Sequence, residues 1–484
     1  MNYKLIAYIN GLLLLILAFI MFLTGLTGLA PGGSGGEEFF SATMVAAFFG
    51  GILVLSAWGE KYEDITIRSG YMLTVSSWLL ICLFCALPLY WSDLDLSFTD
   101  AVFESVSGLT TTGATILTGL DKMPHDILLW RSMLHWMGGV GIVIMAMALL
   151  PILRIGGMSL FRREASDMAG KVTARLSTYI KMTVFLYSLI TLVFMWLLFF
   201  AGMSPFDALN HAISAVATGG FSTHDQSVSY FNSATIETIL IAGMVVGSLP
   251  FPLYVHAVFG NRRSFSITRY GQVVAFLRVL CVATLAVTLW NWSTNDMSFL
   301  YALRVSAFNI TSVITTSGFM SADFATWGSF ATGVFFLLYF IGGCAGSTTG
   351  SVKIFRWQLL FRGMYVQFIK NLSPHQVVGV RYGGHLVDEN VMRSVRNFLF
   401  LYFLTFAFIS LAVMACGVDF MTSIVAVAMA LANAGIGLGE VIGPTQNLAA
   451  LPSTVKWLLD AAMILGRLEL FTVFALFIPQ FWRR

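Results

Sequence analysis

The chain is built from long apolar segments, and this feature limits its possible folds more than any other. Ten segments approach or exceed the ~20 apolar residues that a membrane-spanning helix needs. In chain order they are 5–29, 40–57, 70–91, 127–153, 176–202, 236–260, 271–293, 329–361, 395–417 and 454–482. Asp, Glu, Lys and Arg make up only 11% of the 484 residues, and a soluble or disordered chain needs far more charge. The sequence therefore predicts an all-α polytopic membrane protein.

Lysine and arginine are distributed unevenly between alternate connections. One set holds Lys61, Arg68, Arg154, Arg162, Arg163, Lys171, Arg175, Arg262, Arg263, Arg269, Arg356, Arg362, Lys370, Arg381, Arg393, Arg396, Arg483 and Arg484. The opposite set holds Lys122 and Arg304 beside acidic residues such as Asp100, Glu104, Asp126 and Glu237. Because cytoplasmic loops are rich in Lys and Arg, we expect both termini to be cytoplasmic. We also expect a negative outer face that attracts cations.

Four outer connections contain an internal repeat. Each carries a short apolar stretch that ends in a cluster of small polar residues and glycine, which suggests a re-entrant segment. Asp100 precedes Gly113 by thirteen residues, and Asp207 precedes Gly220 by the same distance. In every repeat a small polar residue stands two before the glycine: Thr111, Thr218, Thr316 and Asn433. We interpret Asp100 and Asp207 as N-terminal caps of the dipping helices, in preference to ion ligands.

Four such units around one axis can build an ion filter. Irregular backbone at membrane depth is tolerated where it lines a polar cavity, and rings of carbonyl oxygens can replace the hydration shell of a monovalent cation. Glycine permits the left-handed backbone that such a turn needs. The predicted filter residues are Thr111, Thr112, Gly113, Thr218, Gly219, Gly220, Thr316, Ser317, Gly318, Asn433, Ala434 and Gly435.

These motifs resemble the Trk/Ktr/HKT superfamily of potassium transporters, in particular the membrane subunits of bacterial Trk uptake systems. The matching motifs are Thr-Thr-Thr-Gly113-Ala-Thr, Ala-Thr-Gly-Gly220-Phe-Ser, Thr-Thr-Ser-Gly318-Phe and Asn-Ala-Gly435-Ile-Gly. The resemblance covers nearly the whole chain and implies two leading helices plus four helix–pore helix–helix units around a pseudo-fourfold pore. It implies passage of K⁺ and Rb⁺. In this superfamily a serine in place of the first repeat's glycine goes with Na⁺ permeation, so Gly113 implies that K⁺ is favoured over Na⁺.

The resemblance also implies a location, an oligomeric state and partner subunits for the chain. These are a bacterial inner membrane, a homodimer, and TrkA-type cytosolic subunits that bind NAD or ATP while this chain binds no cofactor. The expected units are 1–69, the leading helices; 70–165, 166–265, 266–375 and 376–484, the four repeats. The amphipathic stretches 154–175 and 362–394 are candidates for contact with a soluble partner or with anionic lipid.

Segment 329–361 is too long for one span and is interrupted by a glycine-rich stretch, 341–353. It lacks the GxxxxGK[ST] order of a phosphate-binding loop, so we expect a helix broken at membrane depth. The resemblance implies an intramembrane loop that obstructs the pore and moves on gating; a packing kink is the alternative. Its candidate residues are Gly342, Gly343, Gly346, Ser347, Thr348, Gly350 and Lys353.

Arg467 lies inside the last apolar segment, ~18 Å from its start at ~1.5 Å per residue. A charge near the midplane is costly and normally faces the protein interior. The resemblance implies an arginine that guards the pore beneath the filter. The alternative is a salt bridge with Asp460 or Glu469, although Glu469, two residues away, is on a different helix face.

Two other functions remain open at this stage. One is a K⁺ symporter coupled to H⁺ or Na⁺, for which the deep acids are Asp460 and Glu469. The other is a membrane-embedded enzyme, for which we find no catalytic cluster. His135, His211 and His256 are isolated, so neither a metal other than K⁺ at the filter nor haem is expected. The CxxC of Cys82 and Cys85 is interpreted as packing, and no nucleic-acid partner is expected.

Overall fold

The computed structural model describes residues 3–59, 66–148, 176–259 and 270–483. Much of the basic set lies outside the described residues: Lys61, the basic residues of 154–175, Arg262, Arg263, Arg269 and Arg484. The amphipathic stretch 154–175 also lies outside them. Within the described chain, seven helices are long and apolar enough to cross a membrane, or eight if one bent pair counts as a span. The seven are α1 (Tyr3–Gly28), α2 (Glu37–Ser56), α3 (Ile67–Trp91), α5 (His125–Ala148), α8 (Leu176–Phe200), α12 (Gly271–Thr294) and α16 (Glu389–Ala415).

Three of the predicted spans are broken rather than continuous. Segment 236–260 forms α10 (Ala234–Ser248) and α11 (Phe251–Phe259), which are bent by 91°. Segment 329–361 forms α14 (Ser329–Leu338), an irregular stretch and α15 (Ile354–Leu372). Segment 454–482 forms α18 (Ser453–Arg467), α19 (Phe471–Phe474), a 3₁₀ turn (Ala475–Phe477) and α20 (Pro479–Trp482). The prediction of continuous spans was wrong for 236–260 and 454–482, because apolar composition does not register a break whose polar groups are bonded inside the protein. The break predicted within 329–361 is present.

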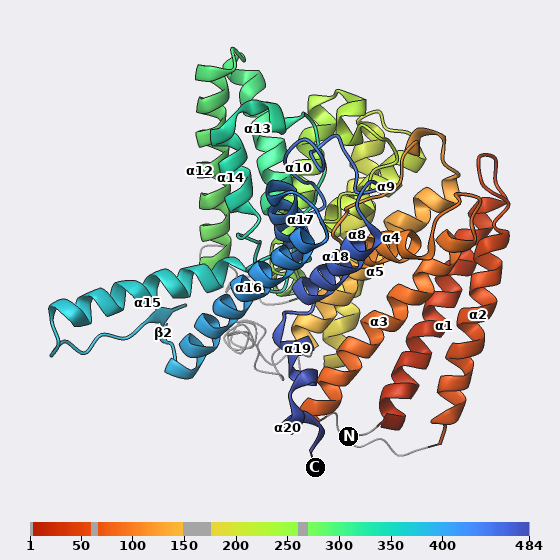
Figure 1. Ribbon diagram of the computed structural model, residues 1–484, viewed down its shortest axis with the longest axis horizontal. Coiled ribbons are helices and arrows are strands. Elements are labelled where there is room, and N and C mark those ends of the chain that lie inside the picture. The colour runs from red at the N-terminus through yellow and green to blue at the C-terminus, as the bar shows by residue number, and fades with distance from the viewer. Residues whose placement is uncertain (1–2, 60–65, 149–175, 260–269, 484) are drawn as a thin grey trace.

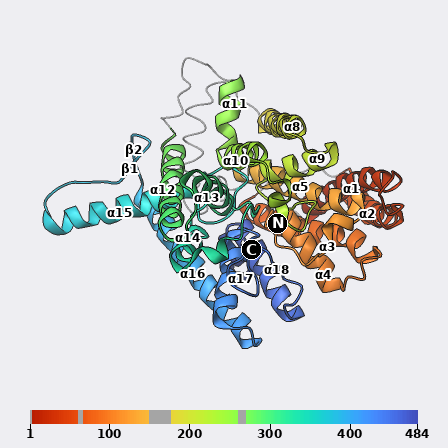
Figure 2. The same ribbon diagram turned by 90° about the horizontal axis from the view of Figure 1, so that it is seen from above.

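Four shorter helices dip between the spans, one in each repeat. They are α4 (Phe98–Leu109), α9 (Pro205–Val216), α13 (Phe299–Ile314) and α17 (Phe420–Ala432). Seen from above, the four repeats follow one another around the centre of the molecule, while α1 and α2 lie at its edge (Figure 2). Ten of the thirteen residues of α17 are buried, whereas Phe200 of α8 is 78% exposed where lipid would cover it. The pore helices therefore form the interior, and the long spans surround them.

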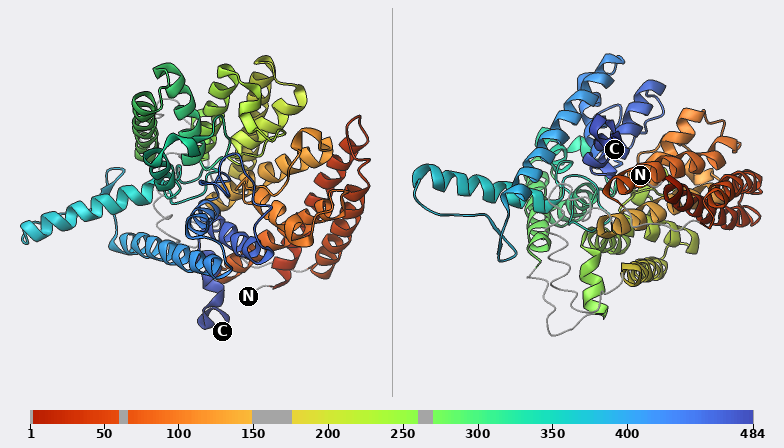
Figure 3. Two further views of the ribbon diagram at one scale, coloured as in Figure 1. Left: turned by 45° about the horizontal axis from the view of Figure 1, so that its top comes forward. Right: turned by 90° about the horizontal axis from the view of Figure 1, so that it is seen from below.

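The remaining elements are short. They are the 3₁₀ turns Leu120–Lys122, Ser227–Phe231 and Phe324–Trp327, and the antiparallel pair β1 (Arg381–Tyr382) and β2 (His385–Leu386), with Arg381 opposite Leu386. Helix α15 projects sideways from the body together with this hairpin (Figure 1). Both chain ends lie at the same end of the molecule, and two further views show the same arrangement (Figures 1 and 3).

The pore helices begin three residues earlier than the aspartates suggested. Ser97 caps α4 and Ser204 caps α9, each accepting a hydrogen bond from the backbone N–H of the aspartate three residues on. Each serine hydroxyl also donates to that aspartate's Oδ2 at 2.7 Å. Asp100 and Asp207 thus bond the capping serines through their backbone and side chains and are not the caps themselves. Their prediction as N-caps was wrong by almost one helical turn.

Candidate ion pathway

All four pore helices end in the same way. The residue two before each repeat glycine has left-handed backbone, with φ of 52° at Thr111, 53° at Thr218, 57° at Thr316 and 54° at Asn433. The next N–H then bonds the carbonyl five residues back: Thr112 to Ser107, Gly219 to Ser214, Ser317 to Ser312 and Ala434 to Met429, at 2.8–3.0 Å. This turn closes the helix and directs the following backbone away from it, as a C-terminal cap does.

The four segments that follow these turns meet one another. A Cβ built on Gly113 would lie 1.8 Å from the carbonyl O of Gly219, and one on Gly220 would lie 1.9 Å from that of Ser317. A Cβ built on Gly318 would lie 3.0 Å from Gly435 N, and one on Gly435 would lie 2.3 Å from Thr112 O. The backbones therefore close a ring in the order of the repeats, too tight for any side chain. Gly113, Gly220 and Gly318 also have positive φ, which Gly435 does not.

The ring's carbonyl oxygens carry no internal hydrogen bond. Within the described chain no donor reaches the carbonyls of Thr112, Gly113, Gly219, Gly220, Ser317, Gly318, Ala434 and Gly435. Buried carbonyls are normally satisfied, so eight unbonded carbonyls in one place are unusual. The arrangement thus offers stacked oxygens to a cation that has lost water. The structure brings the twelve predicted filter residues together at the centre of the molecule.

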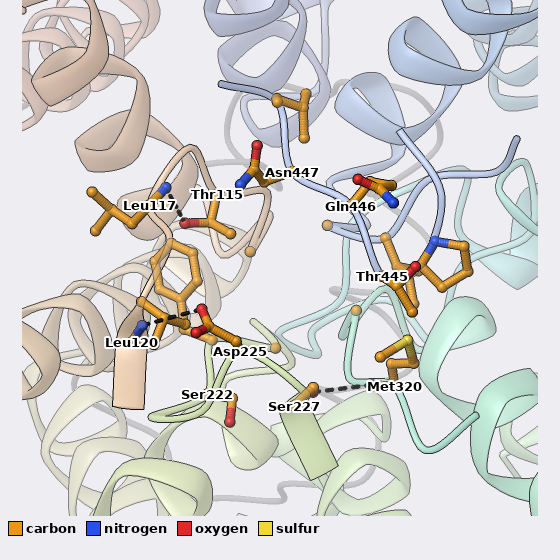
Figure 4. Close-up of a pocket in the computed structure, with 18 of the residues that line it drawn as sticks. Thr115, Leu117, Leu120, Ser222, Asp225, Ser227, Met320, Thr445, Gln446 and Asn447 are labelled. Carbon is orange, nitrogen blue, oxygen red and sulfur yellow. Dashed lines mark hydrogen bonds between the residues drawn. The ribbon is translucent and has the colours of Figure 1, made fainter. Parts of the chain in front are cut away.

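A cavity of about 370 Å³ adjoins the ring. All four repeat glycines line its floor, and outer-loop residues such as Thr115, Asp225 and Gln446 line its wall (Figure 4). Loop 436–448 of the fourth repeat crosses it and donates from Leu448 N to Thr115 O at 3.0 Å.

Some of the acidic residues predicted for the outer face are buried or paired, whereas others, such as Asp93, Asp225 and Asp296, are exposed. Glu104 and Asp126 are fully buried. Glu237 forms a bidentate pair with Arg304 at 2.8 Å, and Asp100 contacts Lys456 Nζ at 2.6 Å. Paired or buried carboxylates attract distant ions weakly. These four residues therefore contribute little to a negative face, and for the exposed acidic residues such a face stays a prediction.

The glycine-rich stretch 341–353 lies directly beneath the ends of the pore helices. Thr348 shares a 3.0 Å hydrogen bond with the Thr218 hydroxyl and donates to Gly247 O at 3.0 Å. The N–H of Gly350 donates to the Thr316 hydroxyl at 2.9 Å. The residues predicted for the loop are buried, and a bridge between Gly342 and Lys353 closes its base. The stretch is a compact loop across the axis of the ring and not a simple kink between two helices.

Arg467 is the last residue of α18, where the helix breaks, and it is 2% exposed. Its guanidinium donates to Thr348 O at 2.8 Å and to Gly138 O at 3.3 Å. A helix C-terminus favours a cation. Glu469 instead pairs with Arg356, so the predicted alternative of a salt bridge between Arg467 and Glu469 is wrong. Lys353 donates to the carbonyl and hydroxyl of Thr349. A cavity of about 20 Å³ is lined by Lys353, Arg467 and Glu469.

The sequence analysis missed several polar residues that contact the outer loops. Arg131, paired with Glu104, donates to Ser222 O and to Thr115 Oγ1. His211 bonds Ser222, and Asn309 bonds Ser321. His224 contacts Asp121 and Asp207. Aligning the repeats on their glycines would have drawn attention to Glu104, His211 and Asn309, because each precedes its glycine by nine residues.

This is the architecture of a membrane ion transporter: four re-entrant helices whose ends surround one ring of carbonyl oxygens. The family model described as "TrkH: Cation transport protein" matches residues 35–484. The chain belongs to this TrkH cation-transport family. The family consists of transporters, so the interpretation as a membrane-embedded enzyme is set aside.

Individual relatives agree with this assignment. The chain is 41% identical to the Trk system potassium uptake protein TrkI of Halomonas elongata over 86% of this chain and 84% of that one. It is 38% identical to TrkH of Salmonella typhimurium over the full length of both. The crystal structure of the potassium transporter TrkH from Vibrio parahaemolyticus superposes with a TM-score of 0.91 at 33% identity, covering both chains completely. The predicted all-α fold with four re-entrant repeats is confirmed.

Proposed function

We propose that the chain is the K⁺-conducting membrane subunit of a bacterial Trk potassium uptake system. The ring of unbonded carbonyls at Gly113, Gly220, Gly318 and Gly435 carries this proposal. Carbonyl dipoles replace the hydration shell of K⁺ without any fixed charge in the filter. The relatives whose full length the chain matches are named as Trk system potassium uptake proteins, which supports K⁺ as the ion.

The direct experiment is ⁸⁶Rb⁺ uptake in a potassium-transport-deficient bacterial strain that expresses the chain, with and without a cytosolic partner. Gly113→Ser should lower the flux ratio of Rb⁺ to Na⁺ in liposomes, because a side chain there meets Gly219 O. Gly333→Ser is the control, since a Cβ at Gly333 meets nothing within 4 Å. Uptake that stays at the level of the empty strain, or a ratio unchanged by Gly113→Ser, would count against the proposal.

The proposal includes a gate beneath the filter, formed by loop 341–353 and Arg467. The loop bonds the ends of the second and third pore helices through Thr218 and Thr316. Arg467 holds it from the opposite side through Thr348 O. A positive charge on the axis raises the barrier to cations, and the small cavity beside it has room for about one water. Opening then requires the loop to leave these partners.

We also propose that the chain works as a homodimer in the inner membrane with both termini cytoplasmic, together with TrkA-type cytosolic subunits that bind NAD or ATP. The relatives' designation as parts of a Trk system supports assembly with other subunits. The projecting helix α15 exposes Phe361, Tyr365 and Phe368, which suits a protein or membrane contact. Crosslinking of cysteines introduced into α15 in native membranes would test the homodimer.

Coupling to H⁺ is a second candidate, and Asp460 is the observation that favours it. This residue of α18 is 3% exposed, and neither carboxyl oxygen has a hydrogen-bond partner within the described chain. Glu469, the other deep acid, pairs with Arg356. Reversal potentials measured with and without a pH gradient separate the two functions. A pH-dependent shift that Asp460→Asn abolishes would favour symport, and no shift would favour a channel.

A further inference from the structure

One position of the pore helices is polar in three repeats and apolar in the fourth. It is the residue nine before the repeat glycine, and it is Glu104, His211, Asn309 and Ala426 in chain order. All four side chains are fully buried. In the first three repeats this side chain bonds the backbone or hydroxyl of a residue two or three after the glycine. The repeats therefore share a contact that spans the filter segment from pore helix to outer loop.

In the first repeat the contact is made by a buried ion pair. Glu104 accepts from Ile116 N at 3.1 Å and from the Thr115 hydroxyl at 2.9 Å. Arg131 donates from Nε to Glu104 at 2.8 Å and from a terminal nitrogen to the Thr115 hydroxyl at 3.1 Å. Its other terminal nitrogen donates to Ser222 O, 3.2 Å away in the second repeat. A network whose members are satisfied in this way is rigid, and it links two neighbouring filter segments.

In the second repeat the contact is made by an imidazole with a defined tautomer. His211 Nδ1 lies 2.9 Å from Asp207 O, and a carbonyl only accepts, so Nδ1 carries the proton. Nε2 therefore accepts from the Ser222 hydroxyl at 2.9 Å. The Ser222 oxygen in turn accepts from His224 N at 3.1 Å. The His211 ring also stacks on Phe319 of the third repeat, with centroids 5.7 Å apart.

The third and fourth repeats complete the comparison. Asn309 accepts from Ser321 N at 3.3 Å and donates to the Ser321 hydroxyl at 3.2 Å. Ala426 has no polar atom with which to make the contact. The fourth segment is bonded from outside its repeat instead, where Tyr339 of the third repeat donates to Ile436 O at 2.5 Å. That bond engages the carbonyl immediately after Gly435.

We propose that Glu104 with Arg131, His211 and Asn309 are positioning residues that fix the filter's carbonyl ring at the size that selects K⁺. This rests on the proposed filter and adds to it the residues that hold its shape. A ring of carbonyls on a flexible backbone contracts around a smaller ion, and bonds on both sides of each glycine resist that contraction. Selectivity therefore depends on side chains that never touch the ion.

The experiment compares Asn309→Leu with Asn210→Leu in the full-length protein in liposomes. Both asparagines are buried on pore helices, but Asn210 Nδ2 donates only to Phe206 O in its own helix. Asn309→Leu leaves Ser321 N without its acceptor and should lower the Rb⁺ to Na⁺ permeability ratio about tenfold. Asn210→Leu should keep that ratio, even if the two variants lose similar thermal stability.

A second variant tests the ion pair without leaving a buried charge, which by itself can prevent folding. Glu104→Leu combined with Arg131→Met should also lower the permeability ratio. The proposal is overturned if both this pair and Asn309→Leu keep the wild-type ratio while Gly113→Ser changes it. If Gly113→Ser has no effect either, the filter assignment fails first, and the positioning role fails with it. A fall in the ratio for Asn210→Leu equal to that for Asn309→Leu would also overturn it.

Discussion

The guanidinium of Arg467 lies 2.8 Å from the carbonyl oxygen of Thr348 and thereby joins the break in α18 to the loop beneath the filter. No acidic side chain pairs with Arg467 among the described residues; the carbonyls of Thr348 and Gly138 hold it. Only the bond to Thr348 O joins Arg467 to the loop, so the loop can leave this charge at the cost of one hydrogen bond, whereas a buried carboxylate would hold it more strongly.

Removing the Arg467 charge should therefore open the pathway. We expect Arg467→Ala to raise ⁸⁶Rb⁺ flux several-fold, because the barrier to cations falls and the loop loses a donor. Arg467→Lys keeps the charge but lacks the two separate guanidinium nitrogens that reach Thr348 O and Gly138 O, and it should give an intermediate flux. Flux is measured in liposomes at equal protein content. Wild-type flux in Arg467→Ala would assign the residue a structural role.

Closure of the ring predicts a second effect, at Gly220. A Cβ there would lie 1.9 Å from Ser317 O, and the φ of +84° disfavours any side chain. Gly220→Ala should abolish Rb⁺ selectivity or reduce Rb⁺ flux more than tenfold, since backbone on both sides would have to shift. Gly271→Ala, where a Cβ meets nothing within 4 Å, should behave as wild type. Equal transport by the two variants would contradict a closed ring.

The sequence predicted the repeat architecture because the repeats keep a fixed spacing. The positions two before each glycine, Thr111, Thr218, Thr316 and Asn433, all adopt the left-handed turn. Glycine and small polar residues are the local signal for such a turn, and local signals can be read from a sequence. The place of these turns along the chain was therefore predictable, as was the break at 341–353.

Long-range contacts were not predictable in the same way. Glu104 was expected to be one of the acidic residues on the outer face, yet it is buried and pairs with Arg131, 27 residues away. His211 read as an isolated histidine, although its ring spans from Asp207 to Ser222. The bend between α10 and α11 depends on bonds to the loop, such as that from Phe251 N to Gly346 O. Such partners are defined only when the chain has folded.

Helix capping gives a prediction on stability. Ser204 Oγ accepts from Asp207 N at 3.0 Å, so Ser204→Ala should destabilise the protein by ~1 kcal/mol. Ser298 occupies the same cap position on α13 but makes no side-chain capping bond. Ser298→Ala should therefore change little. Thermal unfolding of both variants in detergent measures the difference, and a loss for Ser204→Ala no larger than that for Ser298→Ala would show that the Ser204 cap does not stabilise α9.

Stability should also depend on pH through His224, in the outer loop after the second filter segment. Its Nδ1 lies 2.5 Å from Asp121 Oδ1, and its Nε2 lies 3.5 Å from Asp207 Oδ1. Partial burial disfavours the charged ring, but the two carboxylates outweigh it and raise the pKa of His224 above its ordinary 6.5. The same contact lowers the pKa of Asp121.

A raised pKa means that the folded protein holds this proton more tightly than the unfolded chain does. The stabilisation is therefore fully present below pH ~6.5, the ordinary histidine pKa, and is lost as the pH rises through the raised value. His224→Gln should lower the unfolding temperature at pH ~6, where the wild-type pair is charged, and should match wild type more closely at pH ~9. His385→Gln, at an exposed hairpin position, serves as the control at both pH values. A deficit in His224→Gln that is constant across this range would show that the ring stabilises by its stacking on Tyr230, 3.6 Å away between centroids, and not by its charge.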